Sequence, residues 1–191
     1  MRLLLRVGLV FGVLMVSVFP AFAAGDERGE IAGGYSYMYD SDISTGFPAG
    51  WFVSAGANLT NVFAVVGDVS GNYKSESAAS GTATASATLK VHTFTAGPRV
   101  TGRSGPVRFF AQFLVGAATA SAGVTASSGG ASIAVSDSNT EFCYVPGAGV
   151  DIDFTSGAGI RIGANERLIH ATGSTSKEFQ LEAGVVLRFG K

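Results

Sequence analysis

The amino-acid sequence predicts an all-β fold, an eight-stranded antiparallel up-and-down transmembrane β-barrel, and three observations support this prediction. Eight segments alternate between apolar and polar or small residues with a period of two, the pattern of strands whose two sides face different surroundings. The connections between these segments alternate between long and short, as in barrels with tight turns at one rim and loops at the other. The composition is 47% hydrophobic and only 14% charged, whereas soluble domains carry about 25% charged residues.

The first 23 residues have the layout of a secretory signal peptide. Arg2 and Arg6 flank the start of the chain, an apolar run extends from Val7 to Phe19, and small residues at Ala21 and Ala23 form the pattern that a signal peptidase recognises. The apolar run is about 13 residues long, which is shorter than the roughly 20 residues of a transmembrane helix. We therefore expect cleavage after Ala23, which leaves a barrel domain over residues 24–191.

The composition also excludes several functions. Lys and Arg number 13 and Asp and Glu 14, so the chain lacks the positive charge with which proteins bind nucleic acid. Cys143 is the only cysteine, which excludes an intramolecular disulfide. After the N-terminal segment, no apolar run reaches the roughly 18 residues of a membrane-spanning helix. If the high apolar content reflects a membrane location, the chain must cross the membrane as β-strands.

The first four expected strands cover residues 30–40, 51–59, 63–74 and 88–100. Three of them have a clear apolar side, formed by Ile31, Gly33, Tyr35, Tyr37 and Tyr39, then by Trp51, Val53, Ala55, Ala57 and Leu59, then by Phe63, Val65, Gly67, Val69 and Tyr73. The fourth fits least well, because His92 shares a side with Phe94 whereas Arg99 takes the opposite side. We expect a β-bulge or an irregular end there.

The last four expected strands cover residues 107–115, 142–154, 160–167 and 179–189. Each has an apolar side, formed in turn by Val107, Phe109, Ala111, Phe113 and Val115; by Phe142, Tyr144, Pro146, Ala148, Val150, Ile152 and Phe154; by Ile160, Ile162 and Ala164; and by Phe179, Leu181, Ala183, Val185, Leu187 and Phe189. The expected long loops are 41–49, 75–87, 119–139 and 171–177. The short connections lie at Thr60, at 101–105 and near 155–157.

The polar sides of the strands predict the interior of the barrel. They combine small residues with charges of both signs, and a soluble surface would carry more Lys and Glu and less Gly. Buried charges are costly unless they are paired, so we expect a lumen charge network of Glu30, Asp68, Arg108, Asp151, Asp153, Arg161, Arg167, Glu182 and Arg188. The interior of an eight-stranded barrel is just wide enough to be filled by side chains. The prediction is a filled lumen and no general diffusion pore.

Aromatic residues on the apolar sides gather towards the strand ends. Rings in this position form the interfacial girdles of transmembrane barrels. The expected girdle consists of Tyr37, Tyr39, Trp51, Tyr73, Phe142, Tyr144, Phe179 and Phe189.

The chain resembles small outer-membrane β-barrel proteins of the OmpA/OmpX-like, porin-like superfamily. The resemblance rests on the signal peptide, the eight alternating segments, Gly-Pro-Arg at 97–99, Phe-Ala-Gln-Phe-Leu-Val-Gly-Ala at 110–117 and the final strand at 179–189. It implies an outer-membrane location, contact with outer-membrane lipid, and insertion by an assembly machinery that recognises a terminal aromatic residue. In this chain Gly190 and Lys191 follow Phe189. The resemblance points to a structural or surface-interaction role, and the external loop partner is not indicated.

Two alternatives remain open from the sequence. One is a secreted or periplasmic lipocalin-like carrier, in which the apolar sides of the strands would enclose a ligand. The other is a lipid-modifying enzyme with a site at the rim, for which His170, Ser174 and Ser176 are the candidate residues. Metalloprotease, zinc-ribbon, P-loop and nucleophile-elbow motifs are all missing from the sequence. No catalytic, cofactor or metal site is therefore expected, and His92 and His170 are interpreted as structural.

Overall fold

The fold of the chain is all-β. The computed structural model describes residues 27–81, 83–128, 131–171 and 174–190, so the expected signal peptide lies outside the described residues. The strands of the described part are β1 (Gly29–Asp40), β2 (Thr45–Phe47), β3 (Ala49–Asn58), β4 (Phe63–Ser80), β5 (Ala83–Ser104), β6 (Val107–Ser128), β7 (Ala131–Asp153), β8 (Ala158–Ala171) and β9 (Ser174–Phe189). None of these residues forms a helix long and apolar enough to cross a membrane.

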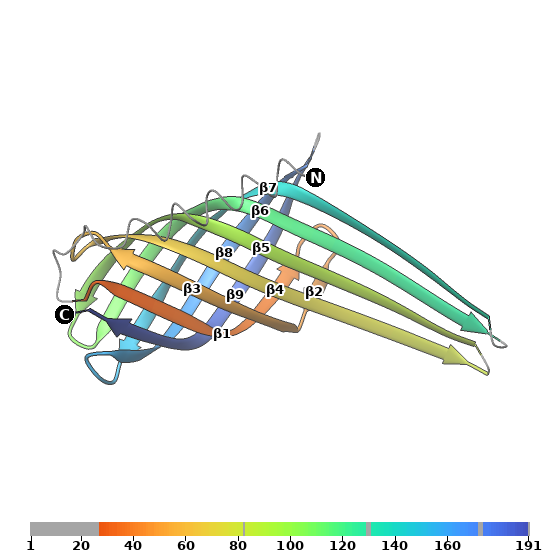
Figure 1. Ribbon diagram of the computed structural model, residues 1–191, viewed down its shortest axis with the longest axis horizontal. Helices are drawn as coiled ribbons and strands as arrows, with labels where there is room; N and C mark the ends of the chain where they lie inside the picture. The colour runs from red at the N-terminus through yellow and green to blue at the C-terminus, as the bar shows by residue number, and fades with distance from the viewer. Residues whose placement is uncertain (1–26, 82, 129–130, 172–173, 191) are drawn as a thin grey trace.

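Eight of these strands close into a ring (Figure 1). From β3 to β9 each strand pairs antiparallel with the next, β3 pairs with β1, and β1 pairs with β9 over its full length, from Gly29 opposite Phe189 to Asp40 opposite Glu178. The short strand β2 adds to the end of β1 and is not a member of the ring. The expected eight-stranded up-and-down barrel is confirmed.

The fourth strand of the ring contains no bulge, although its pairing with β6 is interrupted at Gly97 and Pro98. β5 pairs with β4 in one unbroken register, from Ala83 opposite Ser80 to Val100 opposite Phe63. Because the register does not shift, ordinary alternation places Arg99 inside the barrel and leaves Phe94 on the outside. Phe94 and Arg99 point to opposite sides because they are five residues apart in a regularly alternating strand.

The two sides of the strands face different surroundings, as the sequence predicts. Phe113 and Val185 point outward and are each 49% exposed, whereas their neighbours Leu114 and Val186 point inward and are buried. The interior is not purely polar, because apolar clusters lie between the charged groups: Ala64, Val66, Leu114, Ala118, Cys143 and Val145; Ala32, Phe52 and Val186; and Met38, Phe47 and Val91. A lipocalin-like carrier needs the apolar sides inward, so that alternative is wrong.

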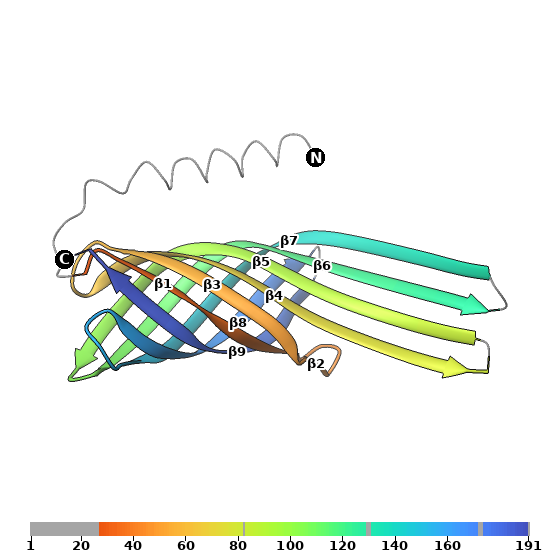
Figure 2. The same cartoon turned by 60° about the horizontal axis from the view of Figure 1, so that its bottom comes forward.

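The ring has two unlike rims. Both ends of the described chain lie at one rim, together with the connections 59–62, 105–106 and 154–157, and we call it the turn rim. At the other rim, β4, β5, β6 and β7 continue far beyond the ring (Figures 1 and 2). We call it the sheet rim.

Two of the expected long loops are strands instead. β3 pairs with β4 only as far as Tyr73, and β8 pairs with β7 only as far as Phe142, yet β4 to β7 stay paired with one another to their tips. We call residues 74–80, 83–90, 121–128 and 131–141 the protruding sheet. Gly81, at a φ of 62°, supports the tight turn between β4 and β5. Residues 75–87 and 119–139 are rich in Ser, Thr and Ala, which differ little in hydropathy. The alternation that indicates a strand is therefore weak in these segments.

The outward face of the ring generates a first prediction. Val185→Arg and Phe113→Arg should each destabilise the protein in bilayers by about 2–4 kcal/mol, because either change places a charge in hydrocarbon. Thr125→Arg, on an exposed strand of the protruding sheet, is the matched control and should be nearly neutral. The measurement is reversible folding into lipid vesicles, followed by Trp51 fluorescence. Stability unchanged by arginine at both 113 and 185 would show that this face does not contact lipid.

Candidate functional site

The lumen near the turn rim is occupied by an arginine held between two acids. Arg161 on β8 donates from Nε to Asp151 Oδ1 at 2.8 Å and from Nη2 to Asp151 Oδ2 at 2.9 Å. The same Nη2 also donates to Glu30 Oε1 on β1 at 2.7 Å. Arg161 is only 2% exposed, so its charge is balanced by these carboxylates and not by bulk water.

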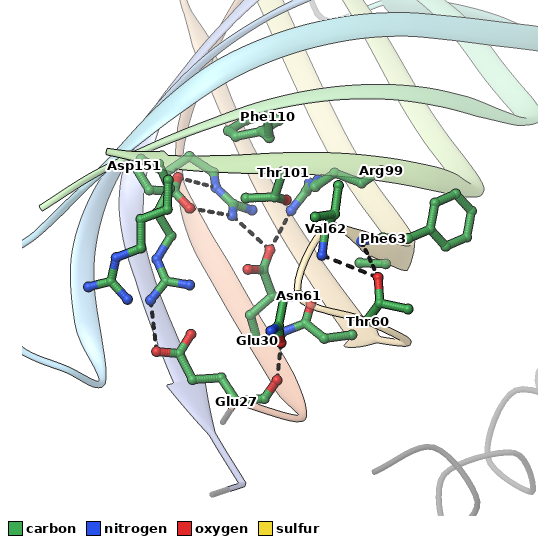
Figure 3. A pocket seen from close by; sticks show the side chains of 15 residues that line it. Glu27, Glu30, Thr60, Asn61, Val62, Phe63, Arg99, Thr101, Phe110 and Asp151 are labelled. Carbon is green, nitrogen blue, oxygen red and sulfur yellow. Dashed lines mark hydrogen bonds and ion pairs between the residues drawn. The ribbon is translucent and has the colours of Figure 1, made fainter. Parts of the chain in front are cut away.

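A second arginine, Arg99, approaches Glu30 from a different wall of the barrel. Arg99 on β5 forms an ion pair with Glu30 and donates from Nε to Gln112 Oε1 at 2.9 Å. The guanidinium groups of Arg99 and Arg161 lie 4.6 Å and 4.8 Å from the centre of the Phe110 ring (Figure 3). These distances suit cation–π attraction. Glu30 and Phe110 thus hold two like charges close together inside the barrel.

Gly149 provides the space for that ring. A Cβ at position 149 would clash with the Ile162 backbone oxygen on β8 and would lie 2.5 Å from the Phe110 ring, closer than real contacts allow. The glycine is therefore required by the close approach of β8 and of this ring.

The network continues to the turn rim. Arg188 forms ion pairs with Asp151 and Asp153, and Arg108 donates to Asp153 Oδ2 at 2.8 Å and to Glu27 Oε1 at 2.7 Å. Asp151 and Asp153 each pair closely with two arginines, whereas the second arginine of Glu27, Arg188, lies 3.8 Å away. The arrangement joins the end of β9 to β6 and β7 through side chains.

A separate cluster lies nearer the sheet rim. Arg167 on β8 donates from Nη1 to Glu178 Oε2 at 2.7 Å and from Nη2 to Gln180 Oε1 at 3.0 Å. It also reaches Ser70 Oγ on β4 at 3.2 Å and the Met38 sulfur on β1 at 3.1 Å. One buried side chain therefore touches three other strands.

All nine charged residues expected in the lumen lie on the inward side of the ring, but they are not all joined. Seven of them form ion pairs within 4 Å. Asp68 and Glu182 have no such pair among the described residues, and Glu182 Oε1 also lacks a hydrogen-bond partner there. These two acids face the interior without a basic group in contact.

Sequence reasoning missed several members of the network. Arg99 lies in the strand whose alternation is least clear in the sequence, and the unbroken register places it inside. Glu178 shares the inward side of the last strand with Gln180 and Glu182, and it directly precedes the expected strand, which begins at residue 179. Glu27 precedes β1, so no strand pattern indicated its role.

A pocket of about 260 Å³ opens beside the network near the turn rim (Figure 3). Its inner wall is formed by Glu30, Arg99 and Phe110, and its outer wall by the connection between β3 and β4. Thr60 shapes that connection, because its Oγ1 accepts hydrogen bonds from the Val62 and Phe63 backbone at 3.2 Å and 2.9 Å. The pocket has both charged and apolar walls, and it ends at the paired charges of the lumen.

The eight residues expected in the aromatic girdle all point outward. Seven lie towards the sheet rim, where Trp51 Nε1 donates to the Tyr73 hydroxyl at 3.0 Å and that hydroxyl lies 3.0 Å from His92 Nε2. Phe189 lies at the turn rim. Phe63, Phe109 and Phe154 lie there too, each more than a third exposed, and the expected girdle did not include them.

Among the candidate residues of a rim enzyme, the described side chains of His170 and Ser176 are not joined by a hydrogen bond. His170 Nδ1 lies 3.1 Å from Thr175 Oγ1, and no carboxylate of a described residue is within hydrogen-bonding distance of its ring. The same residues contain no group of three or more His, Cys, Asp or Glu side chains that could hold a metal ion.

Comparisons with known proteins agree with this architecture. A family model described as outer membrane protein beta-barrel domain matches residues 9–189. The crystal structure of Ail, the attachment invasion locus protein of Yersinia pestis, is similar with a TM-score of 0.60 and 20% identity, over 86% of this chain and all of that one. Neisserial surface protein A is similar with a TM-score of 0.57 and 16% identity, over 87% and 99% of the two chains. No curated protein matches the sequence significantly.

The buried ion pairs generate a second prediction. Arg161→Met leaves Glu30 and Asp151 short of a partner in the lumen and should lower the free energy of unfolding by about 3–5 kcal/mol. Lys74→Met is the matched control, because it removes an ion pair of similar length, 2.9 Å, whose Glu76 side chain is 69% exposed. Its effect should not exceed about 1 kcal/mol. Urea unfolding in vesicles measures both, and equal losses would contradict the assignment.

Proposed function

We propose that this chain, which belongs to the outer membrane protein β-barrel family and resides in the outer membrane, is a closed anchor that presents an interaction surface outside the cell. The proposal has two parts. The lumen is filled by side chains and is not a general diffusion pore. The protruding sheet is the part of the molecule that meets other molecules.

The observation that carries the first part is that side chains cross the lumen at two levels. Near the turn rim, Arg161 on β8 and Arg99 on β5 meet at Glu30 on β1. Nearer the sheet rim, Arg167 reaches from β8 to Ser70 on β4, on the opposite wall of the ring. Because an eight-stranded barrel is narrow, two such crossings leave little space for solutes.

The second part is supported by the shape of the molecule. In bacterial outer-membrane barrels the short turns are periplasmic and the long connections extracellular. The protruding sheet extends from the rim opposite the short turns (Figure 2). By this rule the turn rim faces the periplasm and the protruding sheet stands outside the cell. A sheet that only closed the barrel would not need strands of 18 to 23 residues, since about 9–11 residues suffice to cross a membrane.

The comparison structures are compatible with such a role but do not define it. Ail is an attachment invasion locus protein, and one of its structures contains the heparin analogue sucrose octasulfate. At 16–20% identity these proteins share the fold with this chain. The interaction role proposed here rests on the protruding sheet of this chain.

Current measurements in planar lipid bilayers test the closed lumen. The purified protein should give no stable, large open-channel conductance. The combined variant Arg99→Ser, Arg161→Ser, Arg167→Ser shortens the crossings at both levels and should conduct measurably more, provided that Trp51 fluorescence shows it folded. A stable large conductance from the unsubstituted monomer would contradict the proposal.

A further inference from the structure

The two faces of the protruding sheet differ in polarity, and the difference is the reverse of that in the barrel. Directly opposite residues of an antiparallel sheet share a face. The register therefore places Glu76, Ala87, Val124 and Val135 in one row on the face that continues the lumen side, and Ala78, Ala85, Ala126 and Ile133 in the next row. We call this side the inner face. It is mainly aliphatic.

The opposite face, which continues the lipid-contacting side of the barrel, is polar. Its rows contain Ser75, Thr88, Gly123 and Ser136; then Ser77, Ser86, Thr125 and Ala134; then Ala79, Thr84, Ser127 and Ser132. Hydroxyl groups on this face pair with one another, for example Thr84 with Ser127 at 2.7 Å. Aliphatic residues gathered on one side of a sheet in water stabilise it only when that side is covered.

The inner face is uncovered in the isolated chain. Val124, Val135 and Ile133 are 54%, 67% and 71% exposed. The face begins at the barrel mouth, where Leu89 packs against the buried cluster of Met38, Phe47 and Val91. The aliphatic surface is therefore continuous with a fixed part of the core, which orients it before any partner binds.

The charges around the inner face indicate the chemistry of its partner. On the β4 edge, Lys74 is paired with Glu76 at 2.9 Å. On the β7 edge, Asp137 and Glu141 lie on the inner face, and residues 120–141 contain neither Lys nor Arg. Because interfaces match opposite charges, the partner should combine an apolar stripe with basic groups beside it.

A second copy in the same membrane does not fit this surface. The inner face of each sheet looks over the mouth of its own barrel, since it continues the lumen side. Two upright copies joined inner face to inner face would need their barrels to occupy the same area of membrane. The partner is therefore a different molecule.

The dimensions suit one helix. Four strands span about 14 Å, and four rows of side chains extend over about 20 Å. An α-helix is about 10 Å wide and rises about 1.5 Å per residue, so about 14 residues match the face.

We propose that the inner face of the protruding sheet docks a cationic amphipathic helix. Its apolar stripe would lie on Val124, Val135 and Ile133, and its basic residues beside Asp137 and Glu141. This inference rests on the proposed surface role and adds the class of partner.

Peptide binding to the full-length mature protein in phosphatidylcholine nanodiscs tests the proposal. The probes are a labelled 14-residue amphipathic helix with leucines on one face and lysines beside them, and the same peptide with glutamates in place of the lysines. Empty nanodiscs correct for binding to lipid. The lysine peptide should bind at least tenfold more tightly than the glutamate peptide. Asp137→Asn combined with Glu141→Gln should remove most of that difference.

A matched pair of double variants separates the two faces. Val124→Thr with Val135→Thr keeps the shape of the inner face but makes it polar, and it should weaken binding of the lysine peptide at least tenfold. Thr88→Val with Thr125→Val makes the reverse change on the opposite face and should leave the affinity unchanged. Equal binding of both peptides, or an inner-face variant that binds as the unsubstituted protein does, overturns the docking proposal. It leaves the closed lumen intact, which the conductance measurement tests separately.

Discussion

The structure depends on closing eight strands into a ring whose interior is too narrow for water to solvate charges freely. Closure pairs every ring strand on both edges, from β1 to β9, which removes the open edges that a membrane does not tolerate. The same closure forces the inward side chains to meet one another. Arg161 is therefore paired with Asp151 and Glu30. Ion pairs of this kind, and not contact with solvent, stabilise the charged groups of the interior.

This constraint also explains why the polarity of the sheet changes along its length. Within the membrane the outer side must be apolar and the inner side can hold paired charges, as Phe113 and Arg99 illustrate. Beyond the sheet rim the outer side meets water, and Ser and Thr replace the aliphatic residues there. The inner side becomes aliphatic over the same distance, with Val124 and Ile133 exposed.

Alternation within strands could be predicted from the sequence because it is a local property of the backbone. It placed Arg161, Asp151 and Glu182 inside the barrel without any knowledge of the register. The contacts themselves could not be predicted, because Arg167 meets Ser70 only through the stagger of strands on opposite walls. The protruding strands were interpreted as loops, since Ser, Thr and Ala alternate with too little difference in hydropathy. Regular alternation also predicts the inward position of Arg99, because the register of β5 with β4 contains no bulge.

The central claim is that charges from distant strands hold the interior together, and a double-mutant cycle between Arg99 on β5 and Glu30 on β1 tests it most directly. The variants Arg99→Met, Glu30→Gln and their combination are unfolded in urea from the same lipid vesicles. The account predicts that the double variant loses less stability than the sum of the single variants, with a coupling energy within about 0.5–3 kcal/mol, the range for residues in one network. Additive losses would show that the two side chains do not stabilise one another across the lumen, and would contradict the account.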